Sequence, residues 1–298
     1  MRILNFGSLN LDHVYSVDHF VNPGETISSH KLEIHCGGKG LNHSIALAKA
    51  GLTVHHAGKI GSDGRSLLEF LEDYGVNTDH IQISKLRTGC AIIQVDKNGQ
   101  NAILLYGGAN HDMDESLIRS VIGGFDKGDY LLLQNEINHL GLIMEQAHKI
   151  GMKIIFNPSP ADDLLKELPL EYVSLFLINE IEGEIISGYQ EPEAILEEIR
   201  RRYPESGVLL TMGEKGAYYQ DGEGTWRCNS FKAEAVDTTA AGDTFTGYFL
   251  AGLLNNLPME QTLRQASMAA SIAVSRAGAA VSIPYRREVL KRLSEEAL

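Results

Sequence analysis

Short apolar runs alternate along this chain with segments whose apolar residues recur at helical spacing. This alternation is typical of βαβ units, in which a buried parallel sheet carries helices on both faces. Because it continues over most of the 298 residues, we expect one domain over residues 1–298. The expected strands are Arg2–Gly7, Val54–Gly61, Asp129–Gln134, Lys153–Pro158, Ser174–Asn179 and Gly207–Gly213. The expected helices include Leu41–Ala50, Arg65–Tyr74, His139–Ile150, Pro192–Arg202 and a wholly helical part from Asp243 to Arg276.

Two stretches, about 12–36 and 88–108, break this alternation. Both have the pattern of antiparallel strands, and Asn98-Gly99 marks a hairpin turn in the second. We expect them to form a small antiparallel sheet that is inserted into the main domain as a lid. Apolar side chains fall on both faces of this sheet, so one face could cover a ligand while the other meets the lid of a second copy. The alternative is that the second face packs on the chain's own core.

Composition excludes several classes of partner. The formal net charge is −13 without a long run of Lys or Arg, which argues against nucleic-acid binding. The N-terminus lacks the apolar core of a signal peptide, and no stretch has the apolar length of a membrane span. Cys36, Cys90 and Cys228 are far apart and have no metal-ligand spacing. We therefore expect a cytoplasmic protein that binds neither nucleic acid nor membranes.

The segment CGGKGLNHS, residues 36–44, contains glycines and runs into a helical pattern. Lys39, Asn42 and His43 fall at positions i, i+3 and i+4, so they share a face at the start of this helix. A diglycine lets a ligand approach the backbone, and the free N–H groups of a helix N-terminus suit oxygen atoms. Lys39 and Asn42 would suit a neutral polyhydroxy ligand. The alternative is a flexible start of the helix with two solvated side chains.

A second polar group follows the first predicted strand. In SLNLD, Asn10 and Asp12 lie two residues apart, on one side of an extended segment. Ligands of open α/β sheets bind beyond the carboxyl ends of the strands, which is where these two side chains lie. A turn stabilised by the Asn or Asp side chain is the alternative.

The segment DTTAAGDTFTG, residues 237–247, places three small residues before an acid at the start of a predicted helix. Helix capping alone would explain Asp243. Ala240, Ala241 and Gly242, however, offer consecutive backbone N–H groups with almost no side-chain cover, which is an anion cradle. A carboxylate beside a bound phosphate makes chemical sense if it deprotonates the hydroxyl that attacks that phosphate. The pattern therefore predicts a phosphoryl transferase with Asp243 as general base and residues 240–243 as an anion hole.

The motifs described above resemble those of a known family, the ribokinase-like (PfkB-type) carbohydrate kinases. The resemblance covers nearly the whole chain through motifs in the same order: GSLNLDH, NPGET, GGKGLN, GGAN, LQNE, NPSP, NEIEGE, TMGEKG, DTTAAGDTFTG and SRAGAAVSIP. It implies a Rossmann-like three-layer α/β/α domain with a β-sheet lid, through which members commonly form homodimers. It also implies ATP as the phosphoryl donor, with Mg²⁺ and activation by K⁺.

The resemblance assigns roles to individual positions. Asp243 matches the base, and Gly242 belongs to the anion hole. Positions that hold the sugar hydroxyls match Asn10, Asp12, Gly38, Lys39, Asn42 and Glu136. Positions that contact the nucleotide match Asn179, Thr211, Gly213, Gly216, Gly242 and Ser267, although Ser267 stands where relatives often carry a larger polar residue. Glu182 matches a position linked to Mg²⁺ and phosphate. A monovalent-cation site matches Asp237, Thr239, Ala273, Arg276, Gly278 and Ser282.

The substrate implied is the primary hydroxyl of a pentose, with D-ribose at O5 first among the candidates. Asp12 would repel a sugar that already carries phosphate, and the basic residues of the lid are scattered. A nucleoside such as adenosine remains open because aromatic residues of the lid could stack on a base, and 2-deoxyribose or another small sugar remains open as well. A non-catalytic sugar-binding protein on the same fold is the rival of a different class.

Overall fold

The computed structural model describes residues 1–296, and its main sheet has the strand order β13-β12-β11-β10-β9-β8-β1-β4-β5. The seven strands from β11 to β5 pair in parallel, whereas β12 and β13 add an antiparallel edge. The strands are β1 (Ile3–Phe6), β4 (Val54–Ile60), β5 (Asn77–Ile83), β8 (Tyr130–Gln134), β9 (Lys153–Asn157), β10 (Val173–Asn179), β11 (Gly207–Thr211), β12 (Ala217–Gln220) and β13 (Thr225–Cys228).

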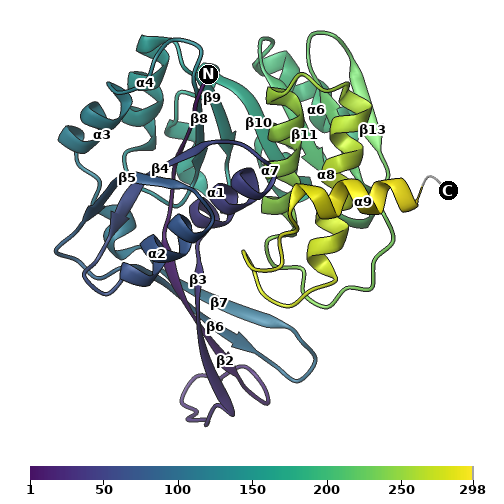
Figure 1. Ribbon diagram of the computed structural model, residues 1–298. Helices are drawn as coiled ribbons and strands as arrows, with labels where there is room; N and C mark the ends of the chain where they lie inside the picture. Colours follow the sequence, from purple (N-terminus) through teal and green to yellow (C-terminus); the bar gives the residue numbers. More distant parts are fainter. Residues whose placement is uncertain (297–298) are drawn as a thin grey trace.

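Helices cover both faces of this sheet, which confirms the predicted three-layer architecture (Figure 1). One layer contains α3 (Glu115–Ile122), α4 (Leu140–Ile150), α5 (Glu180–Ser187) and α6 (Pro192–Arg202). The other contains α1 (Lys39–Lys49), α2 (Arg65–Asp73), α7 (Ala241–Leu254), α8 (Met259–Val274) and α9 (Arg286–Glu295). Within residues 1–296, none of these helices is long and apolar enough to cross a lipid bilayer.

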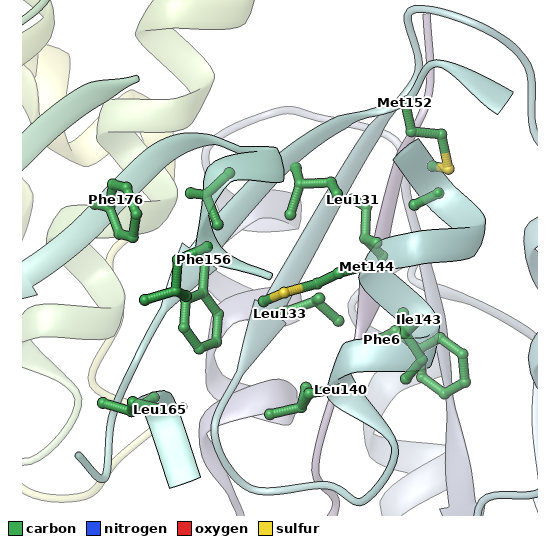
Figure 2. Packing of buried hydrophobic residues seen from close by; sticks show 14 of the residues in the cluster. Phe6, Leu131, Leu133, Leu140, Ile143, Met144, Met152, Phe156, Leu165 and Phe176 are labelled. Atoms are coloured by element: carbon green, nitrogen blue, oxygen red, sulfur yellow. The ribbon is translucent and has the colours of Figure 1, made fainter. Parts of the chain in front are cut away.

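The parallel strands separate two hydrophobic cores because successive side chains of a strand point to opposite faces. Leu131 and Leu133 of β8 belong to the core under α3 and α4, whereas Leu132 between them belongs to the core under α1 and α7. Figure 2 shows the first of these cores, where Met144 of α4 lies over Leu133 and Phe156. Burial on both faces explains why these strands read as continuous apolar runs.

The lid is a four-stranded sheet that projects from the main domain (Figure 1). Its strand order is β3-β2-β6-β7, with antiparallel β2–β3 and β6–β7 pairs and a parallel β2–β6 pair at the centre. The hairpin predicted at Asn98-Gly99 joins β6 to β7, and Gly99 has a φ of 76°. The four strands are β2 (Asn10–Ser16), β3 (Lys31–Gly37), β6 (Gly89–Val95) and β7 (Asn101–Tyr106).

Large apolar side chains are exposed on the lid. Residues directly opposite each other in neighbouring strands share a face, so the pairings place Ile34, Ile92 and Leu104 in one cross-strand row. Their exposed fractions are 57%, 41% and 66%. This row therefore does not pack on the chain's own core. Ile103 and Leu105, which are exposed as well, lie on the opposite face of the same sheet.

Candidate active site

The candidate site lies at the carboxyl edge of the parallel strands, as the sequence predicts. The segment after β1 leads to Asn10, and the segment after β8 leads to Glu136. β10 ends at Asn179, and β11 ends at Thr211. Because all parallel strands end at the same edge of a sheet, these four predicted residues are brought to one side of the molecule.

Asn10 is buried at the base of the lid, and a second asparagine holds it in place. The Asn110 side chain donates from Nδ2 to Oδ1 of Asn10 at 2.7 Å. The same amide accepts from the backbone N–H of Leu9 at 2.9 Å. The Asn10 side-chain amide thereby has a fixed orientation, which leaves its Nδ2 group as the donor for a ligand.

Asp12 stands one pleat further along β2. Burial, together with a smaller contribution from the negative charge of Glu136, raises the pKa of the Asp12 carboxyl to about 7. Gly37 of the paired strand leaves room for this carboxylate, since a Cβ on Gly37 would lie 1.9 Å from Asp12 Oδ2. Two neighbouring acids suit a neutral polyhydroxy ligand better than a phosphorylated one.

Glu136 binds the start of α1 as well as acting on Asp12 through its charge. Its Oε2 accepts a hydrogen bond from the Ser8 hydroxyl and another from the Lys39 backbone N–H at 3.1 Å. Burial raises the pKa of Glu136, while these hydrogen bonds and the Lys39 ammonium act in the opposite direction. One carboxylate therefore connects the segments after β1 and β8 to the helix that carries Lys39 and Asn42.

The glycines at the start of α1 are required by the protein's own packing, while the role predicted for the diglycine, admission of a ligand, stays a prediction. Gly38 has a φ of 93°, a conformation that favours glycine. A Cβ on Gly40 would lie 2.4 Å from the Ser8 backbone nitrogen. Space beside these glycines is thus filled by the turn after β1, because α1 begins directly against that turn.

Asp243 lies in the first turn of α7 and is buried, with an exposed fraction of 8%. Its Oδ2 accepts from Asn42 Nδ2 at 2.9 Å, and its Oδ1 lies 3.3 Å from His43 Nε2. Both partners belong to the first turns of α1. The structure therefore brings Lys39, Asn42 and Asp243 together from segments about 200 residues apart, as their predicted roles require.

The backbone before Asp243 is open to solvent. Ala240 caps α7 in the left-handed conformation, with φ 59° and ψ 12°, which is uncommon for a residue with a Cβ. Gly242 is exposed, and nothing lies within 4 Å of the point where its Cβ would be. Because the first turn of a helix leaves its N–H groups without intrahelical partners, this bare turn can receive an anion.

The Lys39 ammonium faces three carboxylates. Burial alone would lower the pKa of Lys39, but Asp243, Glu136 and Glu182 together raise it above its ordinary value. Lys39 therefore supplies a positive charge between the residues predicted to bind the sugar and those predicted to bind the phosphate.

Asn179 and Glu182 form a capping box at the start of α5. The Asn179 side chain accepts from the Glu182 backbone N–H at 2.9 Å, and Glu182 Oε2 accepts from the Asn179 backbone N–H at 3.0 Å. Glu182 is buried. Helix capping thus accounts for the spacing of these two residues, and the same box holds a carboxylate that could face a hydrated cation. Among residues 1–296, no cluster of three or more His, Cys, Asp or Glu side chains has metal-binding geometry.

The predicted nucleotide loop follows β11. Gly213 and Gly216 have φ values of 53° and 93°, which favour glycine in these turns. Ser267 of α8 is buried and donates to the Asn229 carbonyl at 3.1 Å. The Ser267 hydroxyl therefore contacts the backbone after β13. The Thr211 hydroxyl donates a hydrogen bond to the Ile178 carbonyl at 3.4 Å.

The residues predicted to bind a monovalent cation come from two segments, which hydrogen bonds of Asp237 link to each other. Its Oδ1 accepts from the Thr239 N–H at 2.9 Å, and its Oδ2 accepts from the Gly278 N–H at 3.0 Å. Ser282 is buried, and its hydroxyl donates to the Ala279 carbonyl. The segment around Gly278 thus lies against the segment that leads into the anion hole. Ala273 and Arg276 are linked by a hydrogen bond from the Arg276 N–H to the Ala273 carbonyl.

Sequence reasoning missed two residues that shape the site, Ser8 and Asn110, and one contact, that of His43 with Asp243. The motif GSLN contains Ser8 and the motif GGAN contains Asn110, so both lie in stretches that were already conspicuous. Their partners could not be read from the sequence, because Asn10 and Asn110 are 100 positions apart.

Comparisons with known proteins agree with this geometry. The model of the pfkB family of carbohydrate kinases matches residues 2–286. The chain is 37% identical to the ribokinase of Haemophilus influenzae, over 96% of each chain, and 30% identical to the deoxyribokinase of Salmonella typhi, over 99% of each. Among solved structures, Arabidopsis thaliana ribokinase complexed with ribose and ATP superposes with a TM-score of 0.85 at 29% identity, over 98% of each chain.

Proposed function

The chain belongs to the pfkB family of carbohydrate kinases, which makes it a phosphotransferase with an alcohol group as acceptor, and we propose that the acceptor is the 5-hydroxyl of D-ribose. The observation that carries this proposal is the buried Asp243 carboxylate beside the bare, exposed turn at Gly242. The ribokinase relatives support ribose as the substrate. The deoxyribokinase relative supports 2-deoxyribose as the second candidate.

In the proposed reaction, the side chains around Asn10 and Asp12 orient the sugar so that its primary hydroxyl meets Asp243. The carboxylate accepts the proton of this hydroxyl as its oxygen attacks the γ-phosphorus of ATP, and ADP departs. Asn42 holds one oxygen of the base at 2.9 Å. Backbone N–H groups of residues 240–243 and the Lys39 ammonium would stabilise the charge on the transferred phosphoryl group.

ATP would lie against Thr211, Gly213 and Gly216, with its phosphates pointing toward the start of α7. When bound, Mg²⁺ would neutralise phosphate charge, and the Glu182 carboxylate, held by its capping box, would bind a water of that ion. K⁺ would lie between the segments joined by Asp237, where backbone carbonyls are the ligands it prefers. The enzyme is proposed to act in the cytoplasm, as its widely spaced cysteines suggest.

We also propose a homodimer in which the lids of two copies meet. Support comes from the exposed row of Ile34, Ile92 and Leu104, because exposed apolar patches on soluble proteins mark interaction surfaces.

The test is ADP release by the purified protein with ATP, Mg²⁺ and K⁺ over a panel of ribose, 2-deoxyribose, other free sugars, phosphosugars and nucleosides. We expect ribose to give the highest kcat/KM, and Asp243→Asn to lower kcat by roughly two to four orders of magnitude while ribose still binds. Preference for another sugar would mean that this sugar, and not ribose, is the substrate. Full activity of Asp243→Asn would exclude Asp243 as the general base. No turnover on any substrate would favour the alternative of a non-catalytic sugar-binding protein.

A further inference from the structure

His43 is a buried histidine with no role in the mechanism described so far. It lies on α1 directly after Asn42, and its exposed fraction is 1%. Burial lowers the pKa of the imidazole to about 4, although Asp243 acts in the opposite direction. His43 is therefore a neutral imidazole at physiological pH, and its single N–H group needs a hydrogen-bond acceptor.

The Asp243 carboxylate is the acceptor within reach of that N–H group. Nε2 of His43 lies 3.3 Å from Asp243 Oδ1, and neither ring nitrogen forms a hydrogen bond with residues 1–296. Catalytic hydrogen bonds are often long or poorly aligned before the substrate is bound.

The packing of α1 on α7 fixes this arrangement. One turn further along each helix, Gly247 lies directly against Ala46, so the two helices are in backbone contact. This contact presents two donors from α1 to the two oxygens of one carboxylate, Asn42 to Oδ2 and His43 to Oδ1.

We propose that His43 is a positioning residue for Asp243: its Nε2–H donates to Oδ1 and, together with Asn42, sets the rotation of the carboxylate toward the sugar hydroxyl. The proposal rests on the proposed role of Asp243 as the base. A neutral donor suits this position because it orients the carboxylate without forming a buried ion pair that would weaken it as a base. Lys39, Glu136 and Glu182 are the other charged groups that face this part of the site.

The kinetic test compares His43→Leu, which removes the donor, with His43→Gln, which can supply an amide N–H at similar reach. We expect His43→Leu to lower kcat roughly tenfold to a hundredfold, because a misplaced catalytic group costs about this much, with KM for ribose little changed. The acid limb of its kcat profile should move to higher pH, since an ionised Asp243 loses a donor. His43→Gln should recover most of the rate and restore the acid limb.

His56→Leu is the matched control, because His56 is an equally buried histidine of neutral character that contacts Ser44 and not Asp243. It should lower stability but leave the acid limb of kcat where it is in the wild type. An unchanged acid limb in His43→Leu, or a failure of His43→Gln to recover, would overturn the proposal while leaving the kinase assignment intact.

A second readout does not depend on turnover. Nitrogen-15 NMR of labelled histidine separates the two neutral tautomers, and we expect the Nε2–H tautomer for His43, with a signal that shifts in Asp243→Asn. The Nδ1–H tautomer or an imidazolium at neutral pH would refute the proposal even if the protein phosphorylates no sugar.

Discussion

Gly247 of α7 lies so close to Ala46 of α1 that a Cβ added to Gly247 would be 2.4 Å from the Ala46 Cβ and 2.7 Å from its carbonyl carbon. Backbone atoms cannot move aside as a flexible side chain can, so Gly247→Ala must push the helices apart. We expect a loss of about 1–3 kcal/mol in the free energy of unfolding and a lower kcat, because Asn42 would be displaced from Asp243. Urea denaturation and steady-state kinetics measure both. Gly222→Ala, in open space, is the control and should change neither.

Gly242→Ala should separate stability from activity. In the free protein the added methyl group would meet nothing within 4 Å, and alanine is favoured over glycine in a helix by up to about 1 kcal/mol. The melting temperature should therefore stay the same or rise. The phosphate is proposed to occupy that open space, so kcat should fall steeply. A variant with wild-type kcat would show that the phosphoryl group does not occupy the space beside Gly242.

Ribose affinity should depend on pH through Asp12, whose pKa burial raises to about 7. If the sugar hydroxyls donate to the carboxylate, binding requires the ionised form, and Kd should rise as the pH falls below about 7, by up to about tenfold per pH unit. Titration calorimetry on both sides of neutrality measures this dependence. Asp12→Asn should bind more weakly and with little pH dependence. Constant affinity in the wild type would contradict this role.

Two buried neutral histidines should make the fold sensitive to acid. Burial lowers the pKa of His43 and of His56 from 6.5 to about 4. The unfolded chain therefore binds more protons than the folded one between these values, so stability is lost as the pH falls through this range. Each histidine should contribute up to about 1.4 kcal/mol per pH unit. Urea unfolding at pH 7, 6 and 5 should give a shallower loss of stability for His56→Leu than for the wild type.

The exposed row on the lid should control the oligomeric state. Leu104 is 66% exposed, and a charge there would have to be buried if two lids meet. Leu104→Glu should therefore reduce the mass measured by light scattering from that of a dimer to that of a monomer. Leu164→Glu places the same charge at another exposed leucine, 60% exposed in the segment before β10, and should not change the mass. A monomeric wild type would refute the proposed dimer.

The sequence predicted the parallel strands other than β5 because strands such as β8 are apolar on both faces. It did not predict β5, in which Asn77, Asp79 and Gln82 interrupt the apolar pattern, or the short edge strand β13, in which Thr225 and Arg227 are exposed. Edge strands bury little, so their residues carry a weak signal.

For the site, the sequence indicated segments that the structure brings together, but not all the contacts between them. Small residues before Asp243 predicted an anion-binding turn, and the structure places Gly242 in the open. The sequence did not show that Asp12 and Ser8 pack against the glycines at the start of α1. Such packing depends on which distant segment folds against the glycine, and that information is not local.

Asn42 and Asp243 are 201 positions apart in the chain, and Asn42 contacts the Asp243 carboxylate only when α7 has docked on α1. At a translation rate of about 5–20 residues per second, α7 leaves the ribosome on the order of 10–40 seconds after α1. During that interval a nascent chain carries the lid and most of the predicted sugar-binding residues but not the proposed base. If Asp243 is the base, phosphorylation can begin only after α7 has been synthesised and has docked on α1.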